Sequence, residues 1–384
     1  MKKGFTHIAL VPLLCLSIAL PWLNQWLGFL KNPNLENRQY QSFPAFKTSA
    51  PDSFAMEFNG YISDHFGFRT PLMQQYGKLN LHIFKKSPLP QTVYFGKEGW
   101  MFYTYNELGS WDGSSKFSAA ELDTFRQKFR YRLDNYKQQN IQYYMVVIPC
   151  KQTIYGDKQP EDLVALKKVP NRTDILLQHL RSTLPDLKII DTREAIKAAR
   201  IKQAPRQVFC KTDNHWNPMG AWYAHEAIVQ GLKKYGVNVK THKEQEYKLD
   251  SILNYSGNLA QFTGLTGTAS ETRYILSARY QRGIERLDNY DCIVPQFGNS
   301  WEYQYRFKNR DSSLAKVLFV RDSYGTDMID DLAESTGESL FIFDAWQYGI
   351  NKQWVNIFKP QVVVLMIVEN HLENIIYTTP NPGG

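Results

Sequence analysis

The chain has 384 residues, of which 43% are hydrophobic and 14% aromatic, so it is not an intrinsically disordered protein and can bury a large core. Its formal net charge is +8, but the basic residues are dispersed and form no arginine-rich run, so nucleic-acid binding is not indicated. The positive charge weakly favours an anionic surface or polymer as a partner.

The N-terminus predicts a membrane anchor. Lys2 and Lys3 are followed by Gly4 to Leu30, a stretch without acid, Lys or Arg that is long enough to span a bilayer. A cleaved signal peptide is the alternative, but Ser17–Ala19 is a weak cleavage site and the apolar region continues past it. We therefore expect residues 1–30 to anchor the chain in the inner membrane. The rest would lie on the periplasmic or cell-surface side, after a polar linker at 31–48.

Residues 49–384 are predicted to form one α/β domain. Residues 50–84 are expected to be mostly helical with a break at Pro71, and short strands are expected at residues 91–95 and 100–103. Helices and buried strands alternate from there. The helical pattern covers residues 118–136, 171–183, 191–203 and 217–232, and the strand pattern covers residues 141–148 and 187–190.

Residues 245–310 interrupt this alternation. They are rich in Gly, Asn, Ser, Tyr and Gln, and predict an insertion of loops and short strands. The alternation then resumes, with strands expected at 316–320, 339–343 and 361–368 and helices at 325–336 and 350–358. Short apolar strands alternating with helices predict a parallel sheet covered by helices on both faces.

Reactive side chains directly follow two of the strand-like segments. Asp213 and His215 come after Val208-Phe209, and Ser323 comes after the strand predicted at 316–320. In open α/β sheets, ligands bind beyond the carboxyl ends of the strands. A serine hydroxyl needs a base to take its proton, and the base needs an acid that orients it, so these three side chains predict a catalytic triad. Free backbone N–H groups at a strand-to-helix turn would stabilise an oxyanion.

Each half of this predicted site also has a common structural explanation. An Asp-Ser pair before a helix often caps that helix, and an Asp-x-His pair is often a structural hydrogen bond. Together, each half after a strand in an exported α/β protein, they favour the triad. Cys150, Cys210 and Cys292 cannot all pair with one another and lack the spacing of a metal site, so we expect neither a metal nor a cofactor.

The same motifs resemble a known family. The segment TDNHWN at 212–217, followed by VRDSYG at 320–325, is similar to the SGNH-hydrolase-like polysaccharide O-acetyltransferases, the alginate O-acetylation proteins of the AlgJ/AlgX type. Further segments that fit the family are ENRQYQSFP (36–44), DHFGFR (64–69), YFGKEGWMFY (94–103), VVIPCKQTIYGDKQP (146–160) and VVVLMIVENHL (362–372). The resemblance implies an SGNH-like fold with a circularly permuted motif order, in which the acid and the histidine precede the serine.

The resemblance also implies roles for residues of this chain. Ser323 would be the nucleophile, His215 the base and Asp213 its orienting acid. Many relatives have Gly where this chain has Arg321, so that side chain would either crowd the site or bind an anionic sugar. From the residues themselves, Tyr324 is a candidate for substrate contact or for packing, and Lys151 is a candidate for lining the site or for exposure to solvent.

Two residues near the end of the chain are candidates for a supporting role in the site. Glu369 and His371 follow the last predicted strand and are candidates to support the site. Within the family, we expect this chain to be closer to the single-domain, membrane-anchored AlgJ type than to the AlgX type, because no carbohydrate-binding domain is expected after the last strand.

The function that the resemblance implies is O-acetylation of an exopolysaccharide or envelope glycan outside the cytoplasm. Because acetyl-CoA is cytoplasmic, a multi-spanning membrane O-acyltransferase would be the partner that supplies the acetyl group. Two other functions stay open. One is a carbohydrate acetylesterase, in which water replaces the sugar, and the other is a non-catalytic glycan-binding subunit of a polysaccharide assembly complex.

Overall fold

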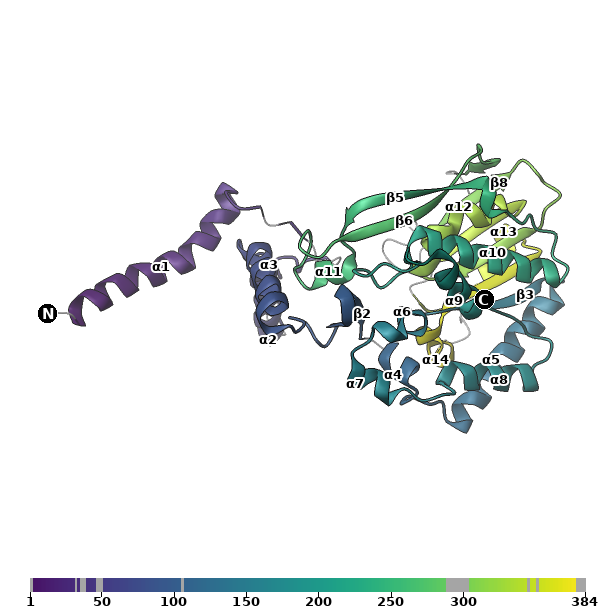
Figure 1. The fold of residues 1–384 in the computed structure, drawn as a ribbon, viewed down its shortest axis with the longest axis horizontal. Coiled ribbons are helices and arrows are strands. Elements are labelled where there is room, and N and C mark those ends of the chain that lie inside the picture. Colours follow the sequence, from purple (N-terminus) through teal and green to yellow (C-terminus); the bar gives the residue numbers. More distant parts are fainter. Residues whose placement is uncertain are drawn as a thin grey trace. The chain divides into compact units, whose positions relative to one another are not determined.

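The computed structural model describes residues 3–31, 33–34, 39–45, 51–104, 107–287, 304–343, 346–349 and 352–377. Its chain divides into two compact units (Figure 1). Unit 1 contains residues 1–94 and 256–270, and unit 2 contains residues 95–255 and 271–384. The predicted boundaries at 30 and 48 remain predictions. Cys150 and Cys210 are buried free thiols, whereas Cys292 lies outside the described residues.

Unit 1 is helical. It contains α1 (Lys3–Leu27), α2 (Pro51–Asp64), α3 (Arg69–Leu79), the π-helical turn η1 (Asn80–Phe84) and α11 (Asn258–Phe262). The helical prediction for 50–84 is confirmed, but the break precedes α3. Pro71 lies in the first turn of α3, where the N–H that proline lacks has no helical partner in any case. The N-terminal segment does form a helix, but no helix among the described residues is long and apolar enough to cross a membrane. The predicted spanning anchor therefore has no support from the structure.

Unit 2 is built on a seven-stranded sheet with the strand order β4-β3-β11-β9-β10-β8-β7. The strands are β3 (Gln142–Ile148), β4 (Lys188–Asp191), β7 (Ile284–Arg286), β8 (Tyr305–Asn309), β9 (Lys316–Arg321), β10 (Glu338–Phe343) and β11 (Val362–Val368). The first five strands in the spatial order are parallel, while β8 and β7 run antiparallel to their neighbours. The predicted parallel sheet is therefore confirmed and carries an antiparallel edge.

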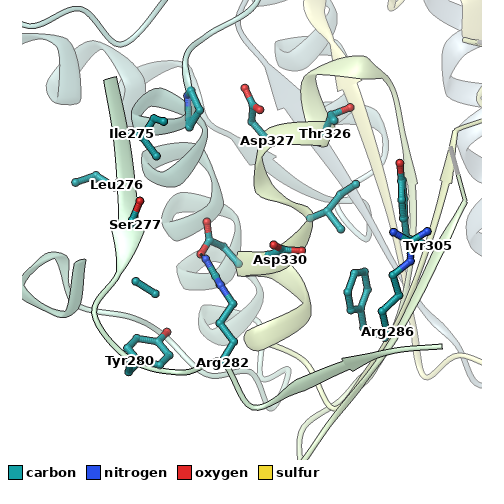
Figure 2. Close-up of a pocket in the computed structure, with 15 residues that line it drawn as sticks. Ile275, Leu276, Ser277, Tyr280, Arg282, Arg286, Tyr305, Thr326, Asp327 and Asp330 are labelled. Carbon is teal, nitrogen blue, oxygen red and sulfur yellow. Dashed lines mark ion pairs between the residues drawn. The ribbon is translucent and has the colours of Figure 1, made fainter. Parts of the chain in front are cut away.

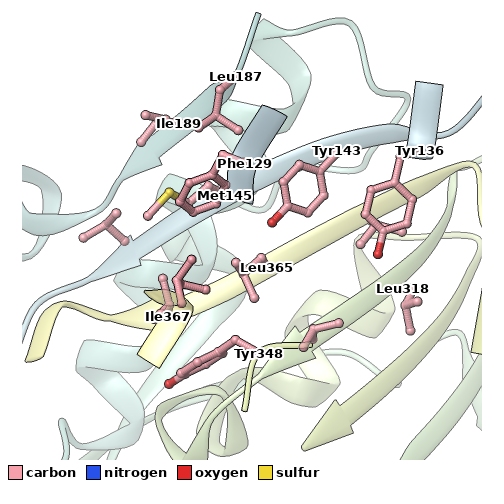
Figure 3. Packing of buried hydrophobic residues seen from close by; sticks show 14 of the residues in the cluster. Phe129, Tyr136, Tyr143, Met145, Leu187, Ile189, Leu318, Tyr348, Leu365 and Ile367 are labelled. Atoms are coloured by element: carbon pink, nitrogen blue, oxygen red, sulfur yellow. The ribbon is translucent and has the colours of Figure 1, made fainter. Parts of the chain in front are cut away.

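Four helices cover one face of this sheet: α5 (Ala119–Gln138), α8 (Arg172–Thr183), α13 (Lys352–Phe358) and α14 (Asn374–Tyr377). Alternate residues of each strand point to them, so Tyr143, Met145 and Leu365 share a core cluster with Phe129 of α5 (Figure 3). All four of these side chains are at most 5% exposed. This core rigidly positions the central strands whose carboxyl ends carry the candidate site.

The second face of the sheet is covered by α9 (Arg193–Gln203), α10 (Pro218–Lys234) and α12 (Ile329–Glu334). Asn217 caps α10 by accepting the Gly220 N–H at 2.9 Å, as the sequence predicts. The helix predicted at 325–336 is instead a 3-10 segment, η6 (Ser323–Met328), that leads into α12.

Within 245–310, where loops and short strands are predicted, two of the strands are longer than expected. β5 (Tyr247–Tyr255) has 9 residues and β6 (Glu271–Ala278) has 8, and they pair as an antiparallel ribbon. Most β5 side chains are exposed, so no apolar alternation marks the strand in the sequence. Both strands belong to unit 2. The chain leaves unit 2 after Tyr255, at the end of β5, and re-enters it at Glu271, at the start of β6.

Short elements complete the described chain: the two-stranded sheet of β1 (Val93–Phe95) and β2 (Met101–Tyr103), the helices α4 (Glu107–Asp112), α6 (Lys151–Ile154) and α7 (Glu161–Leu166), and the 3-10 turns η2 (Lys97–Gly99), η3 (Gly156–Lys158), η4 (Glu244–Glu246) and η7 (Glu369–His371).

Candidate active site

Ser323 lies directly beyond the carboxyl end of β9, at the first position of η6. The fully buried Asp322 before it fixes this turn. One oxygen of the Asp322 carboxylate accepts the Tyr324 N–H at 2.9 Å, and the other accepts the Tyr348 hydroxyl and the Val368 N–H, both at 3.0 Å. Because Val368 is the last residue of β11, Asp322 joins the ends of two neighbouring strands beneath the serine.

Asp213 and His215 lie on a loop made of consecutive bends. The loop is closed by an isolated antiparallel bridge between Phe209 and Trp216. The His215 N–H donates to Asp213 Oδ1 at 3.1 Å, so the acid also holds the backbone of its own turn. The two side chains thus meet through a turn, without the extended backbone that an i, i+2 pair on a strand would need.

The structure brings the three predicted residues into one hydrogen-bonded line. His215 Nε2 lies 2.9 Å from Ser323 Oγ, and His215 Nδ1 lies 2.8 Å from Asp213 Oδ1. A carboxylate can only accept, so Nδ1 carries the imidazole proton. Nε2 of the neutral ring is then the acceptor for the Ser323 hydroxyl, which is the arrangement a general base requires.

Asp213 and His215 shift each other's pKa values. Burial alone raises the pKa of the Asp213 carboxyl. Hydrogen bonds and charge attraction from His215, with the Tyr255 hydroxyl, outweigh burial and hold this pKa well below its usual range. For His215, burial lowers the pKa, but Asp213, and more weakly Asp327 and Asp322, raise it above its ordinary value of 6.5. Asp213 is therefore ionised at neutral pH, and it stabilises the imidazolium form of His215.

The ribbon supplies supporting residues that the sequence did not reveal. The Tyr255 hydroxyl, at the end of β5, donates to Asp213 Oδ2 at 2.8 Å. Glu271, opposite it at the start of β6, accepts the Lys211 N–H at 2.6 Å and the Thr212 N–H at 2.7 Å. The ribbon thus holds both the acid and the turn before it.

A small cavity opens beside the triad. It has a volume of about 220 Å³ and is lined by Asp213, His215, Trp216, Tyr255, Arg273, Ser323, Thr326 and Asp327. Arg273 and Asp327 form an ion pair at 2.8 Å in its wall. The Ser323 and His215 side chains are partly exposed to it, so a small acyl group can reach the hydroxyl.

A larger cavity of about 570 Å³ shares Thr326 and Asp327 with the first one (Figure 2). It lies between β6 and the η6–α12 segment, and Arg286 of β7 and Tyr305 of β8 line its other side. Arg282 pairs with Asp331 at 2.6 Å within it. Among the described residues, no group of His, Cys, Asp and Glu could hold a metal ion.

The backbone at the serine turn only partly meets the expectation of free donors. The Tyr324 N–H is bonded to the Asp322 side chain, and the Gly325 N–H donates to the Asp322 carbonyl at 3.1 Å. Ser323 is the first residue of η6, where the N–H has no partner within the helix. Within the described chain, the Ser323 N–H is the donor of this turn left for an oxyanion.

Arg321 does not line either cavity, and the prediction that it crowds the site or binds sugar is not supported by its position. The side chain is 1% exposed, and its guanidinium lies over the rings of Tyr305 and Phe343. It donates to the Thr326 hydroxyl at 3.0 Å. As the last residue of β9 it packs beneath the turn and supports it, covered by the rings of Tyr305 from β8 and Phe343 from β10.

Tyr324 is 3% exposed and packs against the residues around the serine turn. Its hydroxyl donates to the Asn214 carbonyl at 2.8 Å, and its carbonyl accepts the Trp216 indole N–H at 3.0 Å. Its ring lies 4.8 Å from the His215 ring. Tyr324 therefore joins the serine turn to the histidine loop.

Lys151 is buried and lines neither of these two cavities, so its role in substrate binding stays a prediction. Its ammonium donates to the Met101 carbonyl at 2.7 Å and to the Lys211 carbonyl at 3.2 Å. It also lies over the rings of Trp100 and Phe102. The Lys151 ammonium therefore joins β2 to Lys211, the residue that precedes the Thr-Asp-Asn-His segment.

Two candidates after β11 have structural contacts. Glu369 accepts the Cys150 N–H at 2.9 Å. The ring of His371 lies 3.3 Å from the Tyr348 hydroxyl, which donates to Asp322. His371 therefore reaches the serine turn through two side chains, whereas Glu369 fixes the end of β3.

Residues 93–285 match the family model described as the SGNH hydrolase-like domain of the acetyltransferase AlgX. This range includes Asp213 and His215 and ends before Ser323. Comparison with curated protein sequences gave no match.

Solved structures with a similar fold include the following three. PatB1 from Bacillus cereus, with a sulfonyl adduct, has a TM-score of 0.55 and 14% identity, covering 75% of this chain and 97% of that one. A DHHW family protein from Eubacterium siraeum has a TM-score of 0.50 and 17% identity, covering 75% and 95%. The O-acetyltransferase domain of Pseudomonas putida AlgJ has a TM-score of 0.47 and 16% identity, covering 76% and 94%.

At these identities the first two likenesses establish the fold alone, an SGNH-like α/β sheet covered by helices. The family match spans half of the chain and most of the residues that surround the candidate site. The chain belongs to the AlgX family of SGNH hydrolase-like acetyltransferase domains.

Proposed function

We propose that this protein is a polysaccharide O-acetyltransferase in which Ser323 carries the acetyl group between donor and acceptor. The observation that carries the proposal is the continuous line from Asp213 Oδ1 through His215 to Ser323 Oγ, with contacts of 2.8 and 2.9 Å. Family membership supports acetyl transfer as the reaction, and the line of contacts supports serine as the nucleophile.

The first half-reaction acylates the serine. Ser323 Oγ attacks the carbonyl carbon of the acetyl donor while His215 Nε2 takes its proton. Asp213 stabilises the imidazolium that results, and the Ser323 N–H donates to the oxyanion. When the tetrahedral intermediate collapses, the bond to the leaving group breaks and His215 gives that group its proton. The products are acetyl-Ser323 and the deacetylated donor.

The second half-reaction reverses these roles. A sugar hydroxyl in the small cavity gives its proton to His215 Nε2 and attacks the acetyl carbonyl. The new ester bond to the sugar forms as the Ser323 ester bond breaks, and the proton returns to Ser323 Oγ. The larger cavity, which shares Thr326 and Asp327 with the small one, is where the neighbouring sugars of the polymer would bind. Its carboxylates and guanidinium groups are suitable partners for sugar hydroxyls.

We further propose that the chain acts outside the cytoplasm, on an exopolysaccharide such as alginate or on an envelope glycan. The support is its N-terminal sequence, in which Lys2 and Lys3 precede an uncharged stretch. The donor would be presented by a multi-spanning membrane O-acyltransferase. Cell fractionation with a reporter fused to the C-terminus tests the location, and a cytoplasmic reporter would contradict it.

Ser323→Ala tests the proposal directly. We expect acetyl transfer from a soluble acetyl ester to an oligosaccharide to fall on the order of 10⁴-fold or more, because the acetyl-enzyme can no longer form. Transfer is measured by mass spectrometry of the oligosaccharide, with hydrolysis of the ester followed in parallel. Ser182→Ala, an exposed serine on α8, is the matched control and should keep wild-type rates.

The outcomes separate the candidate functions. Transfer that depends on Ser323 supports the acetyltransferase. Ester hydrolysis that depends on Ser323, without transfer to any oligosaccharide, would keep the triad and replace the proposal with an acetylesterase. Unchanged rates in Ser323→Ala would remove the triad from the reaction.

A further inference from the structure

The α3–η1 segment of unit 1 has its large apolar side chains on the outside. Leu72, Tyr76, Leu79 and Ile83 are 54%, 56%, 42% and 66% exposed, and Phe84 beside them is 56% exposed. At about 100° per residue, the first four lie within about 60° of one another around the helix. They form a continuous stripe, which we call the outer stripe.

The opposite side of the same helix is the packed one, although its residues are small or polar. The buried residues are Thr70, Gly77 and Asn80. A Cβ at Gly77 would lie 2.3 Å from the Thr263 carbonyl oxygen, so the helix backbone packs directly on the end of α11. This is the reverse of a helix in a soluble domain, in which the apolar side faces the core. The outer stripe is therefore suited to an apolar environment outside the unit.

The charge around the outer stripe selects the kind of environment. From His65 to Lys97 the sequence contains no Asp or Glu, whereas Arg69, Lys78, Lys85 and Lys86 are basic. Lys85 and Lys86 follow η1 directly and are exposed. Aromatic and aliphatic side chains on one face, flanked by lysines, are typical of helices that lie in the interface of an anionic bilayer.

The chain around α3 gives a second, independent indication. The end of α1 is joined to the loop that begins α3, because Asn24 donates to the Gly67 carbonyl and Gln25 donates to the His65 carbonyl, both at 2.6 Å. Large apolar side chains of α1 such as Leu13, Ile18 and Leu23 are also exposed. Unit 1 therefore has two helices with exposed apolar side chains, and the end of α1 and the start of α3 meet at one loop.

We propose that the outer stripe lies on the surface of a membrane containing anionic lipid, with Lys85 and Lys86 at the headgroups. This contact is separate from the catalytic reaction and from any spanning role of residues 1–30. It places a defined face of unit 1 on the bilayer.

A fluorescent probe at the stripe tests this in the full-length protein. Ile83→Cys is labelled with an environment-sensitive dye in a Cys15→Ser, Cys292→Ser background, in which the buried Cys150 and Cys210 are shielded. On phosphatidylglycerol-containing vesicles, we expect the dye to be quenched by lipid-borne spin labels and shielded from aqueous iodide. A dye at Lys137→Cys, exposed on α5, is the matched control and should remain open to iodide.

The contribution of Lys85 and Lys86 to membrane binding is measured separately. Lys85→Gln with Lys86→Gln should raise the lipid concentration needed for the dye transition by about fivefold for each lysine. Vesicles of phosphatidylcholine alone should reduce the difference between wild type and variant. Circular dichroism and unchanged turnover of a soluble acetyl ester confirm that the variant is folded.

Two results would overturn the inference. If the dye at position 83 stays open to iodide on anionic vesicles, the stripe does not contact lipid, and a protein partner would be its occupant. If the dye at position 137 is quenched equally, the protein adsorbs without a defined face.

Discussion

Asp213 makes two different contacts with its two carboxylate oxygens. Oδ1 binds His215 through both the ring Nδ1 and the backbone N–H, and Oδ2 accepts the Tyr255 hydroxyl at 2.8 Å. The second contact fixes the carboxylate plane, so that Oδ1 faces the ring. Burial of Tyr255, together with the Asp213 charge, raises the pKa of its phenol, so the hydroxyl stays protonated and keeps donating.

Asp213→Asn should lower activity and change its pH dependence. In the proposed mechanism neutral His215 is the base, so the rate rises as pH increases through its pKa, which Asp213 holds above 6.5. An uncharged amide removes that effect and moves the acid limb to lower pH. It also loses the stabilisation of the imidazolium, so kcat should fall on the order of 10²- to 10⁴-fold.

The pH profile of kcat/KM on a soluble acetyl ester measures both effects. His215→Ala is the reference, because loss of the base should leave less activity than Asp213→Asn does. Wild-type rates and an unmoved acid limb in Asp213→Asn would reduce the site to a Ser–His dyad.

At the scale of elements, the β5–β6 ribbon determines the shape of the histidine loop. Glu271→Gln keeps the size of the side chain and removes the charge that accepts the Lys211 and Thr212 N–H groups. A hydrogen bond to a charged acceptor is worth about 1.5–3 kcal/mol, so we expect a looser loop and a fall in kcat of about tenfold or more. The effect of Glu271→Gln on the unfolding temperature should be smaller than its effect on kcat. Activity equal to wild type would show that the ribbon does not position the acid.

The first turn of α10 is a second element-scale test. A Cβ at Gly220 would lie 2.0 Å from the Val208 carbonyl oxygen and 3.1 Å from Trp216 Cβ. Gly220→Ala must therefore shift the helix against the loop, which should cost about 3 kcal/mol or more of unfolding free energy and reduce activity. Gly60→Ala, in a helix with only ordinary contacts, is the control and should be neutral or stabilising. Chemical denaturation that shows no loss for Gly220→Ala would contradict this packing.

Strands that are buried along nearly their whole length, and a helix with clear start signals, could be predicted from the sequence. β3, β9 and β11 are apolar runs, and α10 carries its Asn217 and Pro218 start signal. β5 could not be predicted because its side chains are exposed and its stability comes from pairing with β6. That Ser323 and His215 lie in one site could also be predicted, because each follows a strand-like segment.

The supporting residues could not be predicted in the same way. The contacts of Tyr255 and Glu271 depend on how the ribbon folds back, and no local pattern records them. The burial of Arg321 and Lys151 could not be predicted for a related reason. Charge in the sequence predicts exposure, whereas here aromatic rings and backbone carbonyls surround both side chains.

At the scale of the whole molecule, the residues of the two proposals belong to different units. The triad and both cavities that adjoin it lie in unit 2, whereas the outer stripe and its lysines lie in unit 1. Variants of one should therefore leave the other unchanged. Ser323→Ala should bind anionic vesicles as wild type does, and the variant with both Lys85→Gln and Lys86→Gln should turn over a soluble ester normally.

The most direct test of the catalytic account is detection of the acetyl-enzyme itself. The protein is incubated with a chromogenic acetyl ester, quenched in acid, digested and examined by peptide mass spectrometry. We predict one acetyl group on Ser323, absent in Ser323→Ala, and lost when an acceptor oligosaccharide is added before the quench. Transfer that proceeds with no acetyl on Ser323, or with the acetyl group on another residue, would contradict the account.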